Sequence, residues 1–222
     1  MSGLLFNRHS VFLGASGSGK TEIALNCAVH ARESSGKEVC FFDMDQTKGF
    51  FRSRDFFDIL SEYEINAIDT CRFQDAPVVP AGVLGKMDAP NTLCVFDVGG
   101  NPSGAAMMGQ YADKLRETDS VYYYVINPCR PFMDTAEDLE LTVTEILRAS
   151  NAAPDQIKII SNPNMGKETT ADLVAAQHER LKVRLRSFGM KPAALCVAET
   201  LAFRLTADVP LIPLRLFLRR FY

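Results

Sequence analysis

The chain has 222 residues, 47% of them hydrophobic, which is enough for one sizeable core, so we expect a single domain over residues 1–222. Its 24 basic and 27 acidic residues give a net charge of −3 without a long run of either sign, which argues against a nucleic-acid-binding protein. It has no secretory signal and no apolar run of about 18 residues, so we expect a cytoplasmic protein.

The first predicted elements are a short apolar strand at 11–13, a glycine-rich segment, and a helix that ends at Gly36. In this context the pattern G-x-x-x-x-G-K-[ST] predicts a phosphate-binding P-loop, whereas a chance glycine-rich loop would lack the flanking strand and helix. The glycines let successive backbone N–H groups point at an anion, Lys20 reaches the β- and γ-phosphates, and the Thr21 hydroxyl binds Mg²⁺. The predicted nucleotide-binding segment is Gly14, Ala15, Ser16, Gly17, Ser18, Gly19, Lys20 and Thr21.

The second predicted strand covers 38–42 and ends at two carboxylates, Asp43 and Asp45. Because the carboxyl ends of parallel strands face the ligand crevice, both are candidate catalytic residues. A polar loop at 48–54 follows and leads into a short helix. The stretch 65–91 contains several prolines and predicts only extended chain and a short helix at 81–87.

The third strand, 92–97, ends in Asp97 and is followed by Val98, Gly99 and Gly100. This arrangement is typical of a Walker B strand, whose aspartate binds Mg²⁺ while the glycines let the backbone approach the γ-phosphate. An ordinary turn aspartate is the alternative. The upstream P-loop favours Walker B.

The remaining pattern alternates helices and strands to the end of the chain. We predict helices at 104–118, from Asp134 and Thr135 through Leu147, and at 169–187, with strands at 121–126, 157–160 and 194–197. The alternation predicts an α/β fold with three layers: a mostly parallel sheet with helices on both faces.

Six cysteines are scattered singly, and neither a C-x-x-C pair nor a cluster of histidines occurs in the sequence. We therefore expect reduced core thiols and no disulfide framework or metal site built on these residues. The histidines are expected to be structural or surface residues.

The P-loop, the aspartates at 43 and 45, the segment 97–100 and an asparagine after a late strand together resemble the SIMIBI class of P-loop NTPases. The similarity is greatest to the MinD/ParA-type ATPases and covers about residues 10–165. It implies the P-loop NTPase fold and a nucleotide-dependent homodimer. It also implies that Asp43, with Asp45 as second candidate, positions the attacking water near Mg²⁺, and that Asn162, with Asn164 as runner-up, recognises the base.

The chain departs from this class where Ala15 and Ser16 replace a signature lysine. Arg52, Arg54 and Arg130 are therefore weighed as groups that stabilise the transferring phosphoryl group, although a structural or surface role is favoured for each.

The stretch 162–165 lacks the acid of the guanine-reading motif Asn-Lys-x-Asp, which favours ATP over GTP.

The C-terminal segment 210–222 is apolar and basic, and a helix over 214–222 would place its apolar residues on one face. Such a helix either docks on the protein body or lies on a membrane, and docking is favoured.

The leading functional hypothesis is a Mg²⁺-dependent ATP-hydrolysing switch that regulates or loads a partner protein. One alternative is a small-molecule kinase or ATP-dependent ligase of the dethiobiotin synthetase type. The other is a nucleotide-binding module that does not hydrolyse its ligand.

Overall fold

The computed structural model describes residues 7–45, 57–69, 81–131, 133 and 135–218. Its centre is one eight-stranded sheet in which all neighbouring strands are parallel, in the order β3-β2-β4-β1-β5-β6-β7-β8. The strands are β1 (His9–Leu13), β2 (Glu38–Met44), β3 (Asn66–Asp69), β4 (Thr92–Val98), β5 (Ser120–Ile126), β6 (Ile157–Ser161), β7 (Pro192–Ala198) and β8 (Leu211–Leu214).

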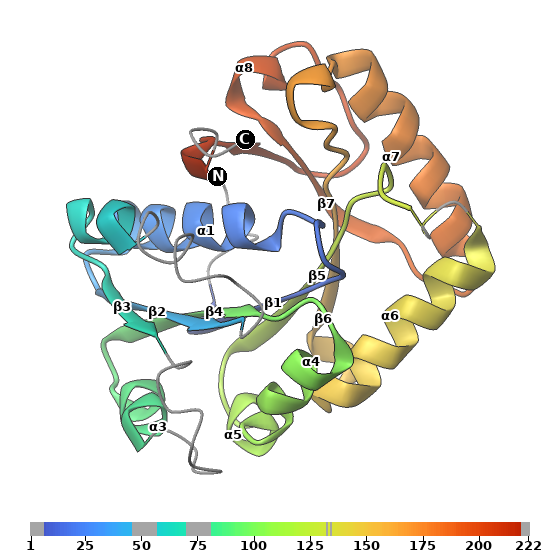
Figure 1. Cartoon of the computed structure of the whole chain (residues 1–222). Coiled ribbons are helices and arrows are strands. Elements are labelled where there is room, and N and C mark those ends of the chain that lie inside the picture. Colours follow the sequence, from blue (N-terminus) through green and yellow to red (C-terminus); the bar gives the residue numbers. More distant parts are fainter. Residues whose placement is uncertain (1–6, 46–56, 70–80, 132, 134, 219–222) are drawn as a thin grey trace.

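Helices cover both faces of the sheet, which confirms the predicted α/β fold in three layers (Figure 1). The helices are α1 (Lys20–Ser35), α3 (Ala81–Asp88), α4 (Pro102–Gly109), α5 (Ala112–Arg116), α6 (Ala136–Ser150), α7 (Ala171–Arg186) and α8 (Glu199–Ala202). On one face α1 packs with the helical residues 57–62, and on the other lie α3, α4, α5, α6 and α7. Because both faces are covered, β1, β4 and β5 are buried along their whole length.

The C-terminus of α1 and the N-terminus of α6 have the capping residues that the sequence predicted. α1 ends at Gly36, which has the left-handed φ of 65° common at helix C-termini. The hydroxyl of Thr135 caps α6 by accepting a hydrogen bond from the backbone N–H of Asp138. Asp134, the other residue predicted at this start, lies outside the described residues.

Two strands were not predicted, so the prediction that the last strand is 194–197 is wrong. β3 falls in the stretch 65–91, and β8 follows α8 at the opposite edge of the sheet. Each is only four residues long. β8 contains Pro213, which lacks a backbone donor and is tolerated at a sheet edge. Short edge strands carry too little periodicity to be recognised without their neighbours.

The predicted helix 104–118 is in fact two helices, α4 and α5, separated at residues 110–111. The break turns Tyr111 into the core, where its ring lies 6.4 Å from that of Phe96 and is 2% exposed. Burying this large ring favours the interruption over a continuous helix.

The described cysteines agree with the expectation of unpaired thiols. Cys27, Cys40, Cys94 and Cys196 are buried, Cys129 is partly buried, and none of these five forms a disulfide. Cys71 lies outside the described residues. Within the part of the chain that is described, no helix combines the length and the apolar character that a membrane crossing requires.

Residues 215–218 lie against α1, which agrees with the docking interpretation of the C-terminal segment. Asn26 exchanges two hydrogen bonds with the backbone of Arg215, at 2.8 and 2.9 Å. The Glu22 carboxylate accepts hydrogen bonds from the N–H groups of Phe217 at 2.7 Å and Leu218 at 3.2 Å. The predicted helix over 214–222 does not begin where expected, since Leu214 ends β8 and residues 215–216 are not helical; Phe217 and Leu218 lie in a 3₁₀ turn, and residues 219–222 are outside the description.

We expect stability to fall as the pH rises from about 4.5 to about 7, because burial raises the pKa of Glu22 from its ordinary 4.5 to about 7. The N–H groups of Phe217 and Leu218 oppose this shift. The folded protein binds this proton more tightly than the unfolded chain, so this contribution is complete below about pH 4.5 and is lost on deprotonation. Urea unfolding across this range should show a loss on the order of 1 kcal/mol.

Glu22→Gln should flatten this pH dependence, since the amide keeps an acceptor oxygen and cannot ionise. Glu168→Gln, which changes an exposed carboxylate, is the matched control. An unchanged pH profile in Glu22→Gln would contradict the assignment.

Candidate functional site

The glycine-rich loop between β1 and α1 requires glycine at two positions for both conformational and packing reasons. Gly14 has φ 144° and Gly19 has φ 88°, in the region that disfavours side chains. A Cβ at Gly14 would lie well under 3.0 Å from the carbonyl oxygen of Val125. A Cβ at Gly19 would lie equally close to the side-chain nitrogen Nδ2 of Asn162. The loop is thus held tightly against the ends of β5 and β6.

Two side chains from neighbouring loops bind carbonyl oxygens of this loop. Asn162, after β6, donates from Nδ2 to the oxygen of Ser18 at 2.8 Å. Arg130, after β5, donates from Nε to the oxygen of Gly17 at 3.1 Å. These contacts engage carbonyl oxygens of the loop and none of its N–H groups, although the N–H of Ser18 donates within the loop to the oxygen of Ala15 at 3.1 Å. An N–H group of this loop without such a partner could serve an anion at the start of α1.

Two buried carboxylates stand side by side at the carboxyl ends of β2 and β4. Asp43 is paired in register with Asp97, and Asp97 with Phe12 of β1. Because side chains alternate along strands and Phe12 packs on the α1 face, both aspartates project toward the face that carries Lys20 and Thr21. Asp43 is 1% and Asp97 0% exposed.

Asp45 forms an ion pair with the P-loop lysine. The Nζ of Lys20 lies 3.6 Å from Oδ2 of Asp45, and both side chains are 7% exposed. The N–H of Asp45 donates to Oδ1 of Asp43 at 3.2 Å. The sequence ranked Asp43 before Asp45, and the structure places Asp45 directly at the lysine.

The glycines after β4 bring this segment against the P-loop. A Cβ at Gly100 would lie 2.6 Å from the backbone nitrogen of Ser16, so the two segments touch. A Cβ at Gly104, in α4, would lie 2.8 Å from Cα of Gly99. Gly104 was not among the predicted site residues, because its role arises only from this contact between α4 and residues 99–100.

The two candidate base-reading asparagines both make internal contacts. Asn162 is 4% exposed and binds the P-loop. Oδ1 of Asn164 accepts hydrogen bonds from Gly166 and Thr169, and its backbone is paired with the side chain of Asn127. Asn127, a buried residue at the end of β5, was not predicted as a site residue. It could have been recognised because, like the aspartates at the ends of other strands, it is a polar residue that ends an apolar run.

The residues at this end of the sheet fit Mg²⁺ together with a polyphosphate. Thr21, Asp97 and Asp43 supply hydroxyl and carboxylate oxygens, the ligands that Mg²⁺ prefers. The buried Oγ of Ser18 has no hydrogen-bond partner among the residues described, although buried polar atoms are normally paired. Of the arginines weighed, Arg130 lies beside the loop, and Arg52 and Arg54 fall outside the described residues.

No protein-family model matches the chain, and no curated protein matches it. Three solved structures similar to it are as follows. FlhF complexed with GMPPNP and Mg²⁺ has 17% identity and a TM-score of 0.47, over 79% of this chain and 62% of that one. The signal recognition particle receptor FtsY from Elizabethkingia anophelis has 14% identity and a TM-score of 0.39, over 86% and 49%. The signal recognition particle 54 kDa protein from Aeropyrum pernix K1, in complex with GDP, has 12% identity and a TM-score of 0.40, over 91% and 36%.

This chain therefore spans less than two thirds of the length of each of these proteins. Each of the three TM-scores is below 0.5.

Proposed function

We propose that this single-domain protein is a cytoplasmic, magnesium-dependent ATPase of the SIMIBI class of P-loop NTPases. In this proposal it acts as a nucleotide-driven switch on a partner protein. The observation that carries the proposal is the convergence, at one end of the sheet, of the glycine-rich loop, Lys20 and the buried Asp43 and Asp97.

Each residue of the site has a task in this proposal. The loop N–H groups at 14–21 bind the phosphates, and Lys20 exchanges its contact with Asp45 for the β- and γ-phosphate oxygens. Thr21 and Asp97, with Asp43, hold Mg²⁺, which neutralises charge on the phosphates when bound. Asp43 and Asp45 orient the attacking water.

Release of Asp45 by Lys20 supplies the switch. In the described structure Asp45 is held between Lys20 and Asp43, so phosphate binding changes the partner of a buried carboxylate at the end of β2. Residues 46–56 follow directly and lie outside the described residues; the large apolar side chains of Phe50 and Phe51 in this segment are the proposed contacts with the partner. The same change would promote a nucleotide-dependent homodimer.

ATP is the proposed nucleotide because the stretch from Asn162 to Met165 carries no acidic residue to read guanine. In this proposal the segment 162–165 after β6 contacts the base, through the side chain of Asn162 or of Asn164. Arg130, which is exposed beside Gly17, is the proposed substitute for the missing signature lysine.

The test is titration calorimetry and phosphate release with ATP and GTP, with and without Mg²⁺. For Asp97→Asn we expect nucleotide binding that no longer depends on Mg²⁺, because the variant loses a metal ligand. For the same reason we expect phosphate release to be at least about 100-fold slower. Asp155→Asn, which changes an exposed aspartate before β6, should behave like the natural chain.

Each other outcome has a distinct meaning. If the folded protein takes up neither nucleotide in the presence of Mg²⁺, the proposal fails. A preference for GTP would overturn the choice of ATP. Binding without phosphate release would support the non-hydrolysing module, and strong stimulation by one metabolite would support the kinase or ligase.

A further inference from the structure

His178 is a buried imidazole away from the P-loop site. It lies on α7, is 2% exposed, and neither ring nitrogen has a hydrogen-bond partner in the described part of the chain. A histidine ring nitrogen is a common metal ligand. Buried polar atoms are normally hydrogen-bonded, so two buried ring nitrogens without a hydrogen bond are unusual.

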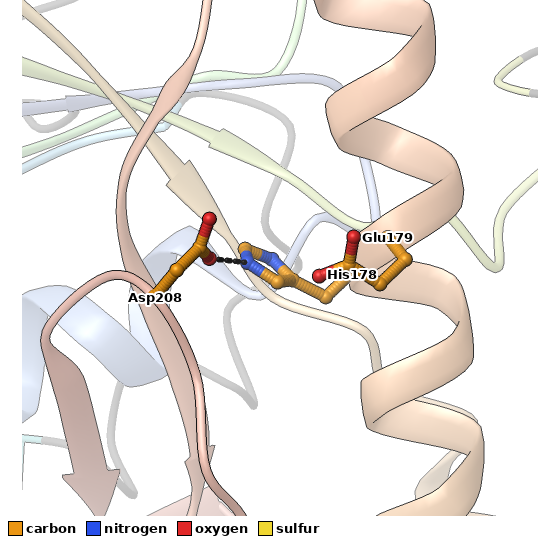
Figure 2. Close-up of side chains that lie close together, drawn as sticks. All are labelled: His178, Glu179 and Asp208. Atoms are coloured by element: carbon orange, nitrogen blue, oxygen red, sulfur yellow. Dashed lines mark ion pairs between the residues drawn. The ribbon is translucent and has the colours of Figure 1, made fainter.

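Two carboxylates face this imidazole (Figure 2). Nε2 of His178 lies 3.8 Å from Oδ1 of Asp208, which comes from the segment before β8 and is too distant for a hydrogen bond. Glu179 follows on α7, and one ligand atom from each of the three residues lies within 4.8 Å of the others. Among the described residues, this is the one group of at least three His, Cys, Asp or Glu side chains placed in this way.

We propose that His178, Glu179 and Asp208 form a binding site for a divalent transition-metal ion of the zinc type. One imidazole nitrogen and two carboxylate oxygens, completed by water, are a common ligand set for zinc. An imidazole ligand argues against Mg²⁺ and Ca²⁺, which prefer oxygen. This site was not predicted from the sequence, because the histidines do not cluster along the chain.

The three ligands are able to close on an ion. Ligands about 2.1 Å from a tetrahedral zinc ion lie roughly 3.4 Å from one another, so the carboxylates need to move by about 1 Å. Glu179 and Asp208 have side chains that are 66% and 58% exposed, which leaves room for a change of rotamer once their contact with Lys182 is broken. The exposed side also provides an entry path for the ion.

Lys182 is a built-in competitor of the ion. Its Nζ lies 2.8 Å from Oε1 of Glu179 and 2.7 Å from Oδ2 of Asp208, and both hydrogen bonds raise the pKa of Lys182. An ion that binds both carboxylates displaces this ammonium group. The affinity of the site is therefore set by the balance between the ion and Lys182.

Occupancy would join α7 to the segment that precedes the edge strand β8. β8 continues into residues 215–218, which are hydrogen-bonded to Glu22 and Asn26 of α1, the helix that follows the P-loop. Because an ion that binds only the folded chain stabilises it, zinc should raise the thermal unfolding temperature.

The experiment titrates zinc chloride into the untagged, chelator-treated full chain, followed by calorimetry and by thermal unfolding. We expect one ion per chain. Asp208→Asn should weaken binding by about tenfold or more, and Lys182→Met should strengthen it by about tenfold, because the first removes a ligand and the second the competitor. Asp97→Asn should leave zinc uptake unchanged, which separates this site from the proposed magnesium site.

Failure of the natural chain to take up zinc would overturn the proposal. Uptake by Lys182→Met alone would also overturn it for the natural chain, since the ammonium would then exclude the ion. Equal affinity in Asp208→Asn and in the natural chain would place the ion elsewhere. None of these results depends on nucleotide binding.

Discussion

Lys20→Met is expected to lower the affinity for ATP in the presence of Mg²⁺ by at least about 100-fold, because charge-assisted hydrogen bonds to phosphate are worth about 1.5–3 kcal/mol each. Lys20 lies at the start of α1, and its side chain is 7% exposed. Its ammonium group is therefore largely shielded from water, which strengthens its interaction with a bound phosphate. Methionine keeps the aliphatic stem and removes only the charge. Titration calorimetry with ATP and GTP measures the loss.

Lys191→Met is the matched control, because it removes an exposed lysine before β7 and should bind nucleotide like the natural chain. Circular dichroism of both variants checks folding, since Asp45 loses its ion-pair partner in Lys20→Met. ATP affinity in a folded Lys20→Met variant within about threefold of the natural value would rule out the assigned role of this lysine.

Gly14→Ala is expected to destabilise the protein by about 2–5 kcal/mol and to abolish nucleotide binding, since backbone strain and overpacking each cost about 1–3 kcal/mol. The residue has φ 144°, and the new methyl group would overlap the carbonyl oxygen of Val125 in the central strand β5. Because that oxygen belongs to backbone, either the P-loop or β5 must move. Denaturant unfolding measures the loss of stability.

Gly85→Ala supplies the comparison within the same chain. Gly85 lies inside α3, and a Cβ there would meet nothing within 4 Å. Alanine at this position should be neutral or stabilise the protein by up to about 1 kcal/mol through helix propensity. If Gly14→Ala unfolded at the same denaturant concentration as Gly85→Ala, the tight fit of the loop against β5 would be disproved.

Six strands were predictable because each contains an apolar or β-branched run that packs against the helices beside the sheet. The P-loop was predictable for a different reason: its glycines and Lys20 are consecutive in the chain, so local chemistry alone specifies them. β3 and β8 were missed because each is a four-residue strand at an edge of the sheet, too short to show a periodic pattern.

Contacts between distant segments could not be read from the linear order. The break between α4 and α5 depends on Tyr111 reaching Phe96 of β4. The position of Asp45 at Lys20, and of Asn162 at Ser18, depends on which strands end beside the loop. His178 and Asp208 meet only because α7 and the segment before β8 lie against the same strand, β7.

The sequence by itself determined the alternation of strands and helices, the glycine loop and the acidic strand ends, because these features follow from the conformational preferences and chemistry of neighbouring residues. Only the tertiary structure decided the strand order, and with it the pairing of Asp43 with Asp97 and the facing of both toward α1. Strand order depends on packing between residues far apart in the chain, where no local preference acts.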